Sequence, residues 1–502
     1  MTRITQQDIE SLYEKIKKKA FKEFHKGNVE QSLKDVSVAA TIAYNSNFIY
    51  KDDDLENLLS KISCRVLPQQ ISPFSKSNKY VLIDAFGLPN QGLTQQYLRA
   101  LIALEVEFLY ILEVASPNSQ IILDEILNSS KGTFCVVGSG KEINKMKFVY
   151  DQITKFQPSA IFAHLTPWDT LATTILYAFS FCTRYNINLT DHAFWLGPGC
   201  FDYTLEFRNY GCTVSYEKRG FSQSQILLNP YYPIIDKTAF LGFPSETKGK
   251  SILFSGGAYY KIYGKNNAFL RMMKRVLDEN PAAILLYAGS GYEKPIKLFI
   301  QENKLEERLL LIGQRKDINE VFAHCDIYIG TYPFSGGLMT QYAAYNSKPV
   351  VAYVDQKDTV NNLQDLISPN RELKYSLTYS DPEDFFAEVK LLIRDVDYRV
   401  SKGREMKSAL KTKEQFDDLF KHFLKNKVAY PFDLVKIDYD ERKQWYLDVI
   451  NEASPHLLGI TLLGAYSLKS IGISWKLVWK ALPKVIEIIK KKLSKKKYNK
   501  TV

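Results

Sequence analysis

The sequence has few of the residues that usually carry metal or redox chemistry. Six cysteines and six histidines occur among 502 residues, and no two cysteines form a C-x-x-C pair. Because scattered cysteines without metal-ligand spacing are typical of reduced proteins, we expect mostly buried, unpaired thiols. The amino terminus is polar and shows no targeting peptide, which predicts a cytoplasmic protein.

Two further absences narrow the function. The sequence contains no P-loop lysine motif, which argues against ATP hydrolysis. Its net charge is +11, but residues 469–502 hold eleven lysines and a single acidic residue. Since nearly all the positive charge lies in this terminal segment, the rest of the chain lacks the basic character of a nucleic-acid-binding protein.

The second half of the chain is a series of short apolar strands alternating with helices. The predicted strands span residues 251–254, 283–288, 309–312, 326–330 and 349–353. This alternation is typical of βαβ units with a parallel sheet. In such sheets ligands bind beyond the carboxyl ends of the strands, where this chain repeatedly places glycine, serine and lysine.

The turn Ser335-Gly336-Gly337 follows one of these strands and precedes a helix. Glycines at such a turn let the backbone approach a ligand, and the exposed N–H groups of the new helix attract anions. The turn therefore predicts a diphosphate site. The alternative is a turn that carries glycine for its geometry alone.

Residues 313–353 resemble the carboxy-terminal half of GT-B glycosyltransferases. The segments 332–337 and 349–351 resemble most closely the O-GlcNAc-transferase-like branch of that family. The resemblance implies that a donor diphosphate is held by the Gly-Gly turn and the following threonine, here Gly336, Gly337 and Thr340.

The sequence departs from the family pattern in three places. Leu338 and Met339 stand where hydroxyl residues are usual, Tyr342 where an acidic residue is common, and Ser347 where glycine usually precedes the final strand. These departures leave the implied fold unchanged and leave the donor unspecified.

Other residues near strand ends complete the predicted donor side. Its further glycines are Gly256, Gly257 and Gly289. Lys261 and Lys265 follow the first glycine turn and are candidates to meet donor phosphates as point charges, whereas exposed loop lysines are usually only solvated. Arg315, which follows the strand ending at Gly313, is expected near the nucleotide.

A first α/β domain is predicted over residues 78–235. A strand at 80–86 leads into a turn bearing Gly87 and Gly92 and then into a helix at 94–104, which also resembles the acceptor-side half of GT-B enzymes. Two later strands end at polar segments that hold His164 with Asp169, and Asp191 with His192.

These two pairs, His164 with Asp169 and His192 with Asp191, are the candidate catalytic residues. A base that deprotonates a sugar hydroxyl must titrate near neutrality at the cleft, and histidine or aspartate meets this condition. The alternative is a structural histidine at a strand end. An enzyme that retains the anomeric configuration needs no dedicated base, and the sequence does not distinguish the two outcomes.

Residues 1–70 are predicted to form a helical hairpin extension with small residues where the helices cross. The pair is reminiscent of one tetratricopeptide hairpin, but no second copy follows, so a repeat array is not predicted. The two interpretations are a cap on the first domain and a module that binds a protein partner.

Residues 426–502 are predicted to form a helical, basic tail, kinked at Pro483. Its tryptophans, aliphatic residues and interleaved lysines are typical of an interfacial membrane helix, and the apolar run 457–468 is too short to span a bilayer. The residues expected at the membrane are Trp475, Lys476, Trp479 and Lys480. The alternatives are a soluble helix packed on the body and a nucleic-acid-binding tail.

The predicted architecture is α/β, with two Rossmann-like domains facing a cleft in a GT-B-like arrangement. Residues 78–235 form the acceptor side and residues 250–425 the nucleotide-sugar side. The predicted function is a glycosyltransferase, of the hexosyl or N-acetylhexosaminyl type, acting in polysaccharide biosynthesis. It would move a sugar from a nucleotide diphosphate donor to a cell-surface or lipid-linked glycan at the inner face of the membrane.

Helix N–H groups and lysines would hold the diphosphate, so no metal or other cofactor is expected. Nucleic acid is not an expected partner. Two alternative functions stay open, a protein O-glycosyltransferase and an inactive GT-B-like subunit that binds a partner.

Overall fold

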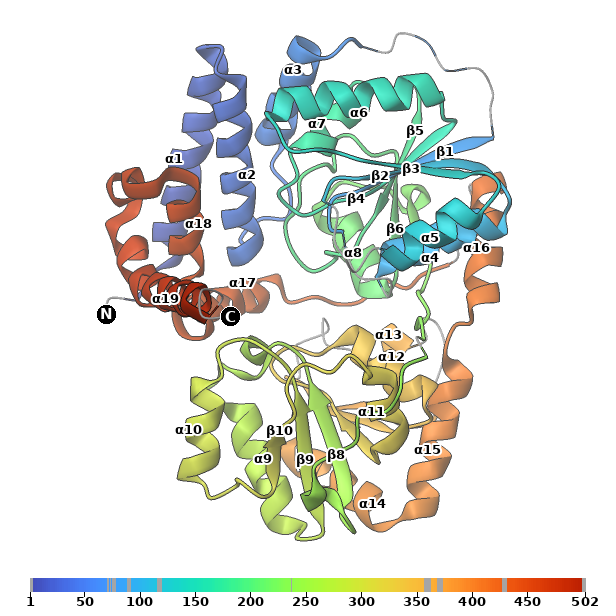
Figure 1. Ribbon diagram of the computed structural model, residues 1–502, viewed down its shortest axis with the longest axis vertical. Helices are drawn as coiled ribbons and strands as arrows, with labels where there is room; N and C mark the ends of the chain where they lie inside the picture. The colour runs from blue at the N-terminus through green and yellow to red at the C-terminus, as the bar shows by residue number, and fades with distance from the viewer. Residues whose placement is uncertain are drawn as a thin grey trace.

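The computed structural model describes residues 3–69, 72, 74, 78–87, 92–114, 120–235, 237–355, 363–367, 373–426 and 431–498. These residues form two α/β domains, one above the other, with a layer of helices along one side (Figure 1). All six cysteines are free, as predicted.

The first domain is built on a seven-stranded sheet with the order β3-β2-β1-β4-β5-β6-β7, and all of its strand pairs are parallel. Its strands are β1 (Lys79–Asp84), β2 (Glu107–Leu112), β3 (Gly132–Val136), β4 (Ala160–His164), β5 (Thr183–Ile187), β6 (Tyr203–Glu206) and β7 (Ile226–Leu228). Its helices are α4 (Leu93–Ala103), α5 (Gln120–Asn128), α6 (Glu142–Phe156), α7 (Leu171–Tyr177) and α8 (Asn209–Lys218). Because the strands are parallel, the polar segments that follow them meet at one edge of the sheet.

The second domain has a six-stranded parallel sheet with the order β10-β9-β8-β11-β12-β13. Its strands are β8 (Ser251–Gly256), β9 (Ala283–Ala288), β10 (Leu309–Leu311), β11 (Ile327–Ile329), β12 (Val350–Tyr353) and β13 (Thr378–Tyr379). Its helices are α9 (Ala268–Glu279), α10 (Lys294–Glu302), α11 (Ile318–His324), α12 (Gly337–Tyr345), α13 (Leu363–Ile367), α14 (Pro382–Arg394) and α15 (Val396–Ala409). Every residue of β9 is buried, as expected for an apolar strand with helices on both faces. The predicted pair of Rossmann-like domains is confirmed.

The helix α16 (Lys413–Asn426) leaves the second domain and packs on the first. Phe416 and Phe420 contact Tyr97 of α4, with ring centroids 5.0 and 5.3 Å apart. The predicted range 250–425 for the second domain therefore includes a helix whose apolar face is buried by the first domain. Beyond it the chain runs along α8, where the Val435 N–H donates to Thr213 Oγ1 at 2.9 Å.

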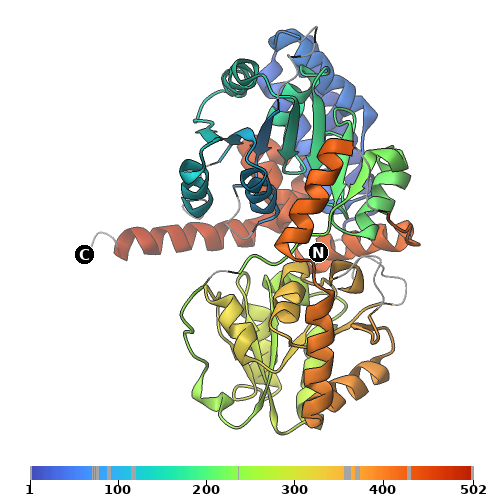
Figure 2. The same cartoon turned by 90° about the vertical axis from the view of Figure 1, so that its right-hand side faces the viewer.

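The layer of helices combines both ends of the described chain. It contains α1 (Gln6–His25), α2 (Val29–Ser46), α3 (Asp53–Val66), α17 (Tyr439–Asp448), α18 (Leu457–Tyr466) and α19 (Ile471–Tyr498). Figure 1 shows α18 beside α1 and α2, and Figure 2 shows the end of α19 projecting from the body.

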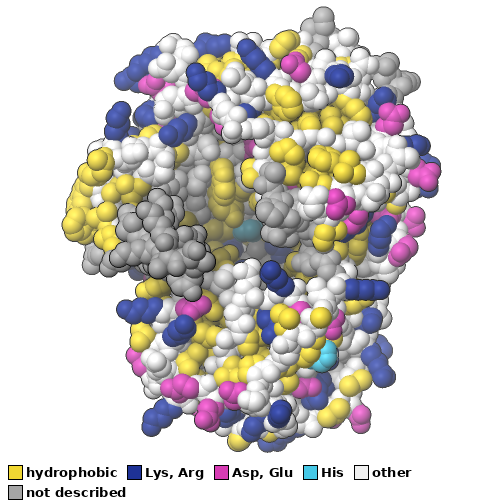
Figure 3. Space-filling model, viewed as in Figure 1, with side chains coloured by type: hydrophobic (Ala, Val, Ile, Leu, Met, Phe, Trp, Pro, Cys, Tyr) yellow, Lys and Arg dark blue, Asp and Glu magenta, His cyan; other side chains and the backbone are white. Residues whose placement is uncertain are grey.

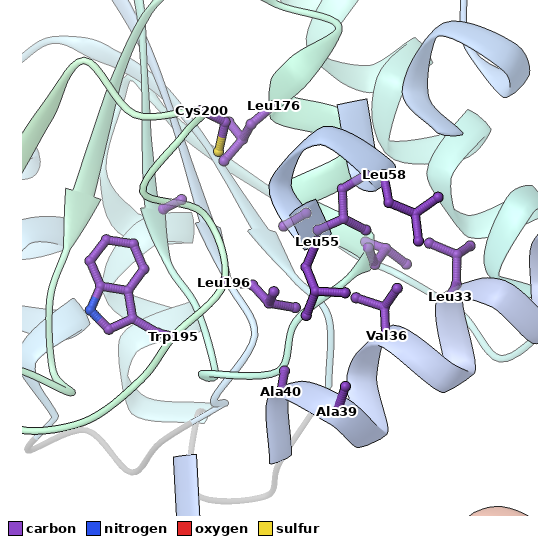
Figure 4. Close-up of a cluster of buried hydrophobic side chains, with 14 of the residues drawn as sticks. Leu33, Val36, Ala39, Ala40, Leu55, Leu58, Leu176, Trp195, Leu196 and Cys200 are labelled. Carbon is purple, nitrogen blue, oxygen red and sulfur yellow. The ribbon is translucent and has the colours of Figure 1, made fainter. Parts of the chain in front are cut away.

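The amino-terminal helices share a hydrophobic core with the first domain. Figure 4 shows Leu33, Val36 and Leu55 from this layer gathered near Leu196, and all four side chains belong to one buried cluster. Helices α3 and α7 are in direct contact. The extension is thus part of the body, which supports the interpretation as a cap on the first domain.

Candidate functional site

A cavity of about 400 Å³ lies between the two domains, beyond the carboxyl ends of both sheets. Figure 3 shows that the molecule is hollowed at this level. The first domain, the interdomain linker (residues 229–250, between β7 and β8), the second domain and the helical layer all contribute lining residues. Of the residues predicted from the sequence, the cavity is lined by Gly92, Asp191, His192, Lys261, Ser335 and Gly337.

The amino end of α12 opens onto this cavity. Gly336 is its N-cap residue and has no side chain to accept hydrogen bonds from the N–H groups of the first turn. A Cβ added to Gly337 would lie 2.7 Å from the Tyr231 hydroxyl, which also lines the cavity. The N–H groups of the first turn, which have no side-chain cap among the described residues, and the helix dipole make this end of α12 attractive to an anion.

Three basic side chains line the cavity, those of Lys261, Arg208 and Arg442. Arg208 is paired with Asp191. Burial lowers the pKa of Lys261, and no carboxylate among the described residues lies within ion-pair distance to offset this effect. Since Asp191 is the one carboxylate in the described lining, the cavity carries an excess of positive charge.

Three glycines at the ends of β8 and β9 pack closely against neighbouring residues beside the cavity. A Cβ added to Gly257 would lie 3.2 Å from Cδ of Lys261, and one added to Gly256 would lie 2.9 Å from Cε of Met339. A Cβ on Gly289 would meet the Gly257 carbonyl oxygen at 2.2 Å. These three glycines therefore allow the strand ends to approach Lys261 and α12 closely, and none of them lines the cavity itself.

His192 and Asp191 form a hydrogen-bonded pair at the end of β5. His192 Nδ1 lies 3.2 Å from Asp191 Oδ1, and Arg208 donates to both carboxylate oxygens of Asp191. Burial alone would raise the pKa of Asp191, but the charge of Arg208 and the hydrogen bonds hold it well below its usual range. Burial lowers the pKa of His192, and Asp191 offsets only part of this effect.

This arrangement makes His192 a neutral imidazole at physiological pH. Its Nδ1–H donates to the carboxylate, which leaves Nε2 as the proton-accepting nitrogen. The side chain is 32% exposed and lines the cavity, so it can receive a proton from a bound molecule.

Two residues from distant parts of the chain hold this loop in place. Arg219 donates from Nη2 to the carbonyl oxygens of Thr190, Asp191 and Ala193 at 3.2, 2.9 and 2.7 Å. Asn47, at the end of α2, donates to the His192 carbonyl oxygen and accepts from the Phe194 N–H, both at 3.1 Å. The amino-terminal extension therefore positions the histidine loop.

No protein-family model matches the sequence. No curated protein matches it either. In structure the chain is similar to an O-GlcNAc transferase from Thermobaculum terrenum, with a TM-score of 0.53 and 12% identity over 88% of this chain and 82% of the other. It is also similar to Anabaena HepE in complex with UDP, with a TM-score of 0.52 and 12% identity over 69% of this chain and 100% of the other. For S. aureus TarM, in a complex that includes UDP, the TM-score is 0.52 and the identity 8% over 70% of this chain and 100% of the other.

The chain has the GT-B fold. The resemblance seen in the sequence is thereby confirmed, and an O-GlcNAc transferase is among the similar structures. Identities of 8 to 12% establish the fold, and the chemistry must be argued from the cavity.

Each residue that departs from the GT-B family pattern has a local environment that can be described from the structure. Leu338 lines the cavity, and Met339 packs against Gly256. The Tyr342 hydroxyl donates to the Ile234 carbonyl oxygen at 3.1 Å, which ties α12 to the interdomain linker. Ser347 has a φ of 55°, a left-handed conformation that explains why glycine is usual at this position.

The second predicted catalytic pair lies outside the cavity. His164 is fully buried, with Nδ1 3.0 Å from Asp84 Oδ1 at the end of β1. Asp169 accepts a hydrogen bond from the Ala172 N–H at the start of α7, and burial, countered only in part by its hydrogen bonds, raises its pKa to about 6. β1 and α7 enclose these two side chains, so their positions favour the structural alternative for both.

Two predicted donor-side residues have internal partners. The Thr340 hydroxyl is buried and donates to the Gly336 carbonyl oxygen at 2.9 Å. Arg315 donates to both carboxylate oxygens of Asp317, and its Nη1 donates to the Gly242 carbonyl oxygen at 2.9 Å. Thr340 thus secures the start of α12, and Arg315 secures the linker.

Of the remaining predicted residues, Gly92 lines the cavity, and Lys265 and Gly87 do not. Lys265 Nζ is 3.6 Å from Asp355 Oδ2 and does not line the cavity. Gly87 has a φ of 55°, and a Cβ there would meet the Val114 carbonyl oxygen at 2.4 Å. Gly92 lines the cavity at the start of α4, while the rest of its turn, 88–91, lies outside the described residues.

Sequence reasoning missed the contribution of α17. Arg442 lines the cavity, and its guanidinium lies 4.6 Å from the ring centroid of Trp445. Trp445 in turn meets Phe334, just before the Gly-Gly turn, with ring centroids 4.0 Å apart. No local pattern marks Arg442, because it reaches the cavity only through the return of the chain past α8.

Proposed function

We propose that this protein is a glycosyltransferase that uses a nucleotide-diphosphate sugar as its donor. The proposal rests on one observation. The amino end of α12, Lys261 and Arg442 all lie at the cavity between the two GT-B domains. These groups supply N–H donors and positive charge, which a diphosphate leaving group requires. HepE and TarM form complexes with UDP, which makes UDP-sugars the first donors to test.

In the proposed reaction the acceptor oxygen forms a bond to the anomeric carbon of the sugar, the bond between that carbon and the diphosphate oxygen breaks, and the leaving oxygen keeps the electron pair of the broken bond. Lys261, Arg442 and the first turn of α12 stabilise the negative charge that develops there. Under this proposal no metal is required for the leaving group. The sugar would be a hexose or an N-acetylhexosamine.

His192 is the proposed base. It would take the proton of the acceptor hydroxyl on Nε2 while Asp191 holds the other ring nitrogen. Asp191 is a positioning residue, because its carboxylate is committed to Arg208 and to His192. In a retaining reaction His192 would orient the acceptor without removing its proton.

We propose a lipid-linked or cell-surface glycan as acceptor, which places the protein in the cytoplasm at the inner face of the membrane. A second candidate function, a protein O-glycosyltransferase, is favoured by the similarity to the O-GlcNAc transferase over 88% of this chain. The departure at Leu338, inside the cavity, is the feature that favours an inactive subunit. Binding of a protein partner by residues 1–70 stays a prediction.

The deciding experiment is a donor screen with the full-length protein. We expect one class of nucleotide sugar to be hydrolysed slowly without an acceptor, with release of the nucleoside diphosphate and no loss of rate in EDTA. Calorimetry with UDP and GDP accompanies the screen. A protein that binds neither nucleotide and hydrolyses no donor would contradict the proposal and favour the inactive subunit.

A further inference from the structure

The helices α18 and α19 form a hairpin whose inner face is covered by the body. The chain reverses after α18 through a short 3₁₀ turn, Ser467–Ser470. The Tyr466 hydroxyl donates to Asp35 of α2 at 2.7 Å, and Lys15 of α1 donates to the Gly472 and Ile473 carbonyl oxygens, both at 3.1 Å. These contacts fix the hairpin on the helical layer.

The two arms of the hairpin pack tightly on each other. A Cβ added to Gly459 of α18 would lie 2.1 Å from the Leu477 carbonyl oxygen and 2.7 Å from the Ala481 side chain of α19. Leu477, Val478 and Ala481 are buried, so this side of α19 is fully used for packing.

The opposite side of α19 exposes large apolar side chains to solvent. The exposed fractions are 50% for Ile471, 63% for Trp475, 61% for Trp479 and 50% for Ile486, and Leu468, in the turn before α19, is 79% exposed. Trp475, Trp479 and Ile486 follow the non-helical Ser474 (φ −154°, ψ 95°) at intervals of four and seven residues, which places them on one stripe of the helix. Figure 3 shows hydrophobic side chains gathered on this side of the molecule. A contiguous patch of this kind marks an interaction surface.

Charge identifies the occupant of this surface as an anionic bilayer. Lys469, Lys476, Lys480 and Lys484 lie in the hairpin, where Lys476 is 3.8 Å from Asp8 and Lys480 donates to Asn451 at 3.4 Å, and the sequence adds six more lysines from position 490 to 497. An apolar protein partner would not require such a charge, whereas anionic lipid attracts each lysine near its surface. Tryptophan beside lysine on an amphipathic helix is the composition of a membrane interface.

The geometry of the α18–α19 hairpin indicates that the hairpin lies in the membrane–water interface and does not cross the bilayer. Residues Leu457–Ile486 are long and apolar enough to cross a membrane by length and composition, with 22% of the apolar window buried. The chain nevertheless turns back at Ser467, where φ is 51°. α18 has 10 residues, and a helix of that length covers only about 15 Å of a hydrocarbon core of about 30 Å.

We propose that the α18–α19 hairpin docks the protein on an anionic bilayer, with Trp475 and Trp479 in the headgroup region. α17, which precedes the hairpin, carries Arg442 in the wall of the donor cavity and Trp445 against Phe334. Docking therefore brings the cavity next to the membrane surface, where a lipid-linked acceptor is presented. This consequence for the acceptor rests on the proposed function, whereas docking itself does not.

The test compares the full-length protein with the double variant Trp475→Ser/Trp479→Ser. The control variant is Ile121→Ser/Leu127→Ser, which removes two comparably exposed apolar side chains from α5 (53% and 65% exposed). Vesicles contain phosphatidylcholine alone or equal parts of phosphatidylcholine and phosphatidylglycerol. Thermal melting and UDP binding establish that each variant is folded.

We expect the wild type and the control to sediment with the anionic vesicles much more strongly than with vesicles of phosphatidylcholine alone. The tryptophan variant should bind them more weakly on the order of a hundredfold, since two large apolar side chains are lost from the interface. Higher salt should weaken wild-type binding without abolishing it, because salt screens the lysines and not the tryptophans. Binding that is unchanged in the tryptophan variant, or absent in the wild type, would overturn the proposal.

Two other occupants give different results. If the hairpin mediated self-association, the tryptophan variant would change the mass measured by light scattering and leave vesicle sedimentation unaffected. If the segment crossed the bilayer, the bound protein would resist extraction at alkaline pH. Either result would overturn interfacial docking. Docking without any donor hydrolysis would instead refute the proposed function and leave the docking surface in place.

Discussion

The replacement Lys261→Met is the sharpest test of the donor site. Lys261 lines the cavity, and burial lowers its pKa without an offsetting carboxylate among the described residues. A partly buried cation without a carboxylate partner loses part of its hydration, and a bound anion recovers that free energy. Methionine keeps much of the length of the side chain and removes the charge, so the variant separates anion binding from packing.

The magnitude follows from the charge and its surroundings. Two unit charges 4 Å apart interact by about 4 kcal/mol at an effective dielectric constant of about 20. Desolvation of the phosphate offsets part of this, and hydrogen bonds to charged groups contribute about 1.5–3 kcal/mol in mutational series. We therefore expect Lys261→Met to weaken UDP binding roughly 10- to 150-fold in Kd. The melting temperature of the free protein should stay the same or rise.

Calorimetry and thermal melting with and without UDP measure both effects. Lys265→Met is the matched control, because Lys265 lies four positions away, pairs with Asp355 and does not line the cavity. Equal losses of affinity in the two variants would show that general charge, and not the cavity lysine, attracts the nucleotide. A fall in the melting temperature of Lys261→Met alone would show that the lysine is structural.

Three further predictions concern the histidine, the Gly-Gly turn and a buried carboxyl pair. His192→Ala should lower turnover about a hundredfold and leave UDP binding and the melting temperature unchanged. In the wild type the acid limb of the pH–rate profile should lie below pH 6.5, because burial lowers the pKa of His192. An acid limb above pH 6.5 would refute the assignment of His192 as the base. Gly337→Val should weaken UDP binding about tenfold or more by pushing against Tyr231 and the helix start, and calorimetry showing wild-type affinity would contradict the anion site. Glu113→Gln should reduce the loss of stability as pH rises through about 6, since burial and the neighbouring Asp169 raise the pKa of Glu113, burial raises the pKa of Asp169 to about 6, and a raised folded pKa stabilises only below that pH. An unchanged dependence of melting temperature on pH would contradict this coupling.

Local patterns in the sequence were sufficient to predict the two sheets, and the anion site that they indicate at the start of α12 stays a prediction. The strand ending near Ile329, the Ser335-Gly336-Gly337 turn and the helix that follows are contiguous in the chain, so their geometry depends on short-range rules. The same rules gave equal weight to His164 and His192, because both follow a parallel strand. Only packing separates them, since the end of β1 encloses His164, whereas the other histidine lies at the cavity.

Local patterns could not predict the contacts that form where the chain folds back on a distant part of itself. α16 contains phenylalanines at helical spacing, which predict an amphipathic helix without indicating which domain buries it. Arg442 lies in a short helix with no distinctive pattern, and its place in the cavity follows from the contacts of residues 433–439 along α8. Long-range contacts of this kind have no signal in a single sequence.

Contacts between the amino-terminal residues and the segment at the end of α17 hold together the helical layer that completes the cavity. Arg3 pairs with Asp448 at 2.6 Å, and the Asn451 side chain exchanges hydrogen bonds with the Ile4 backbone at 2.8 and 2.9 Å. The same layer supplies Tyr44 and Arg442 to the cavity wall. Because these groups come from helices outside both Rossmann-like domains, the two domains alone form an incomplete cavity. The helical layer is therefore a third structural component of the site, and its exposed hairpin links that site to the surface that we propose meets the membrane.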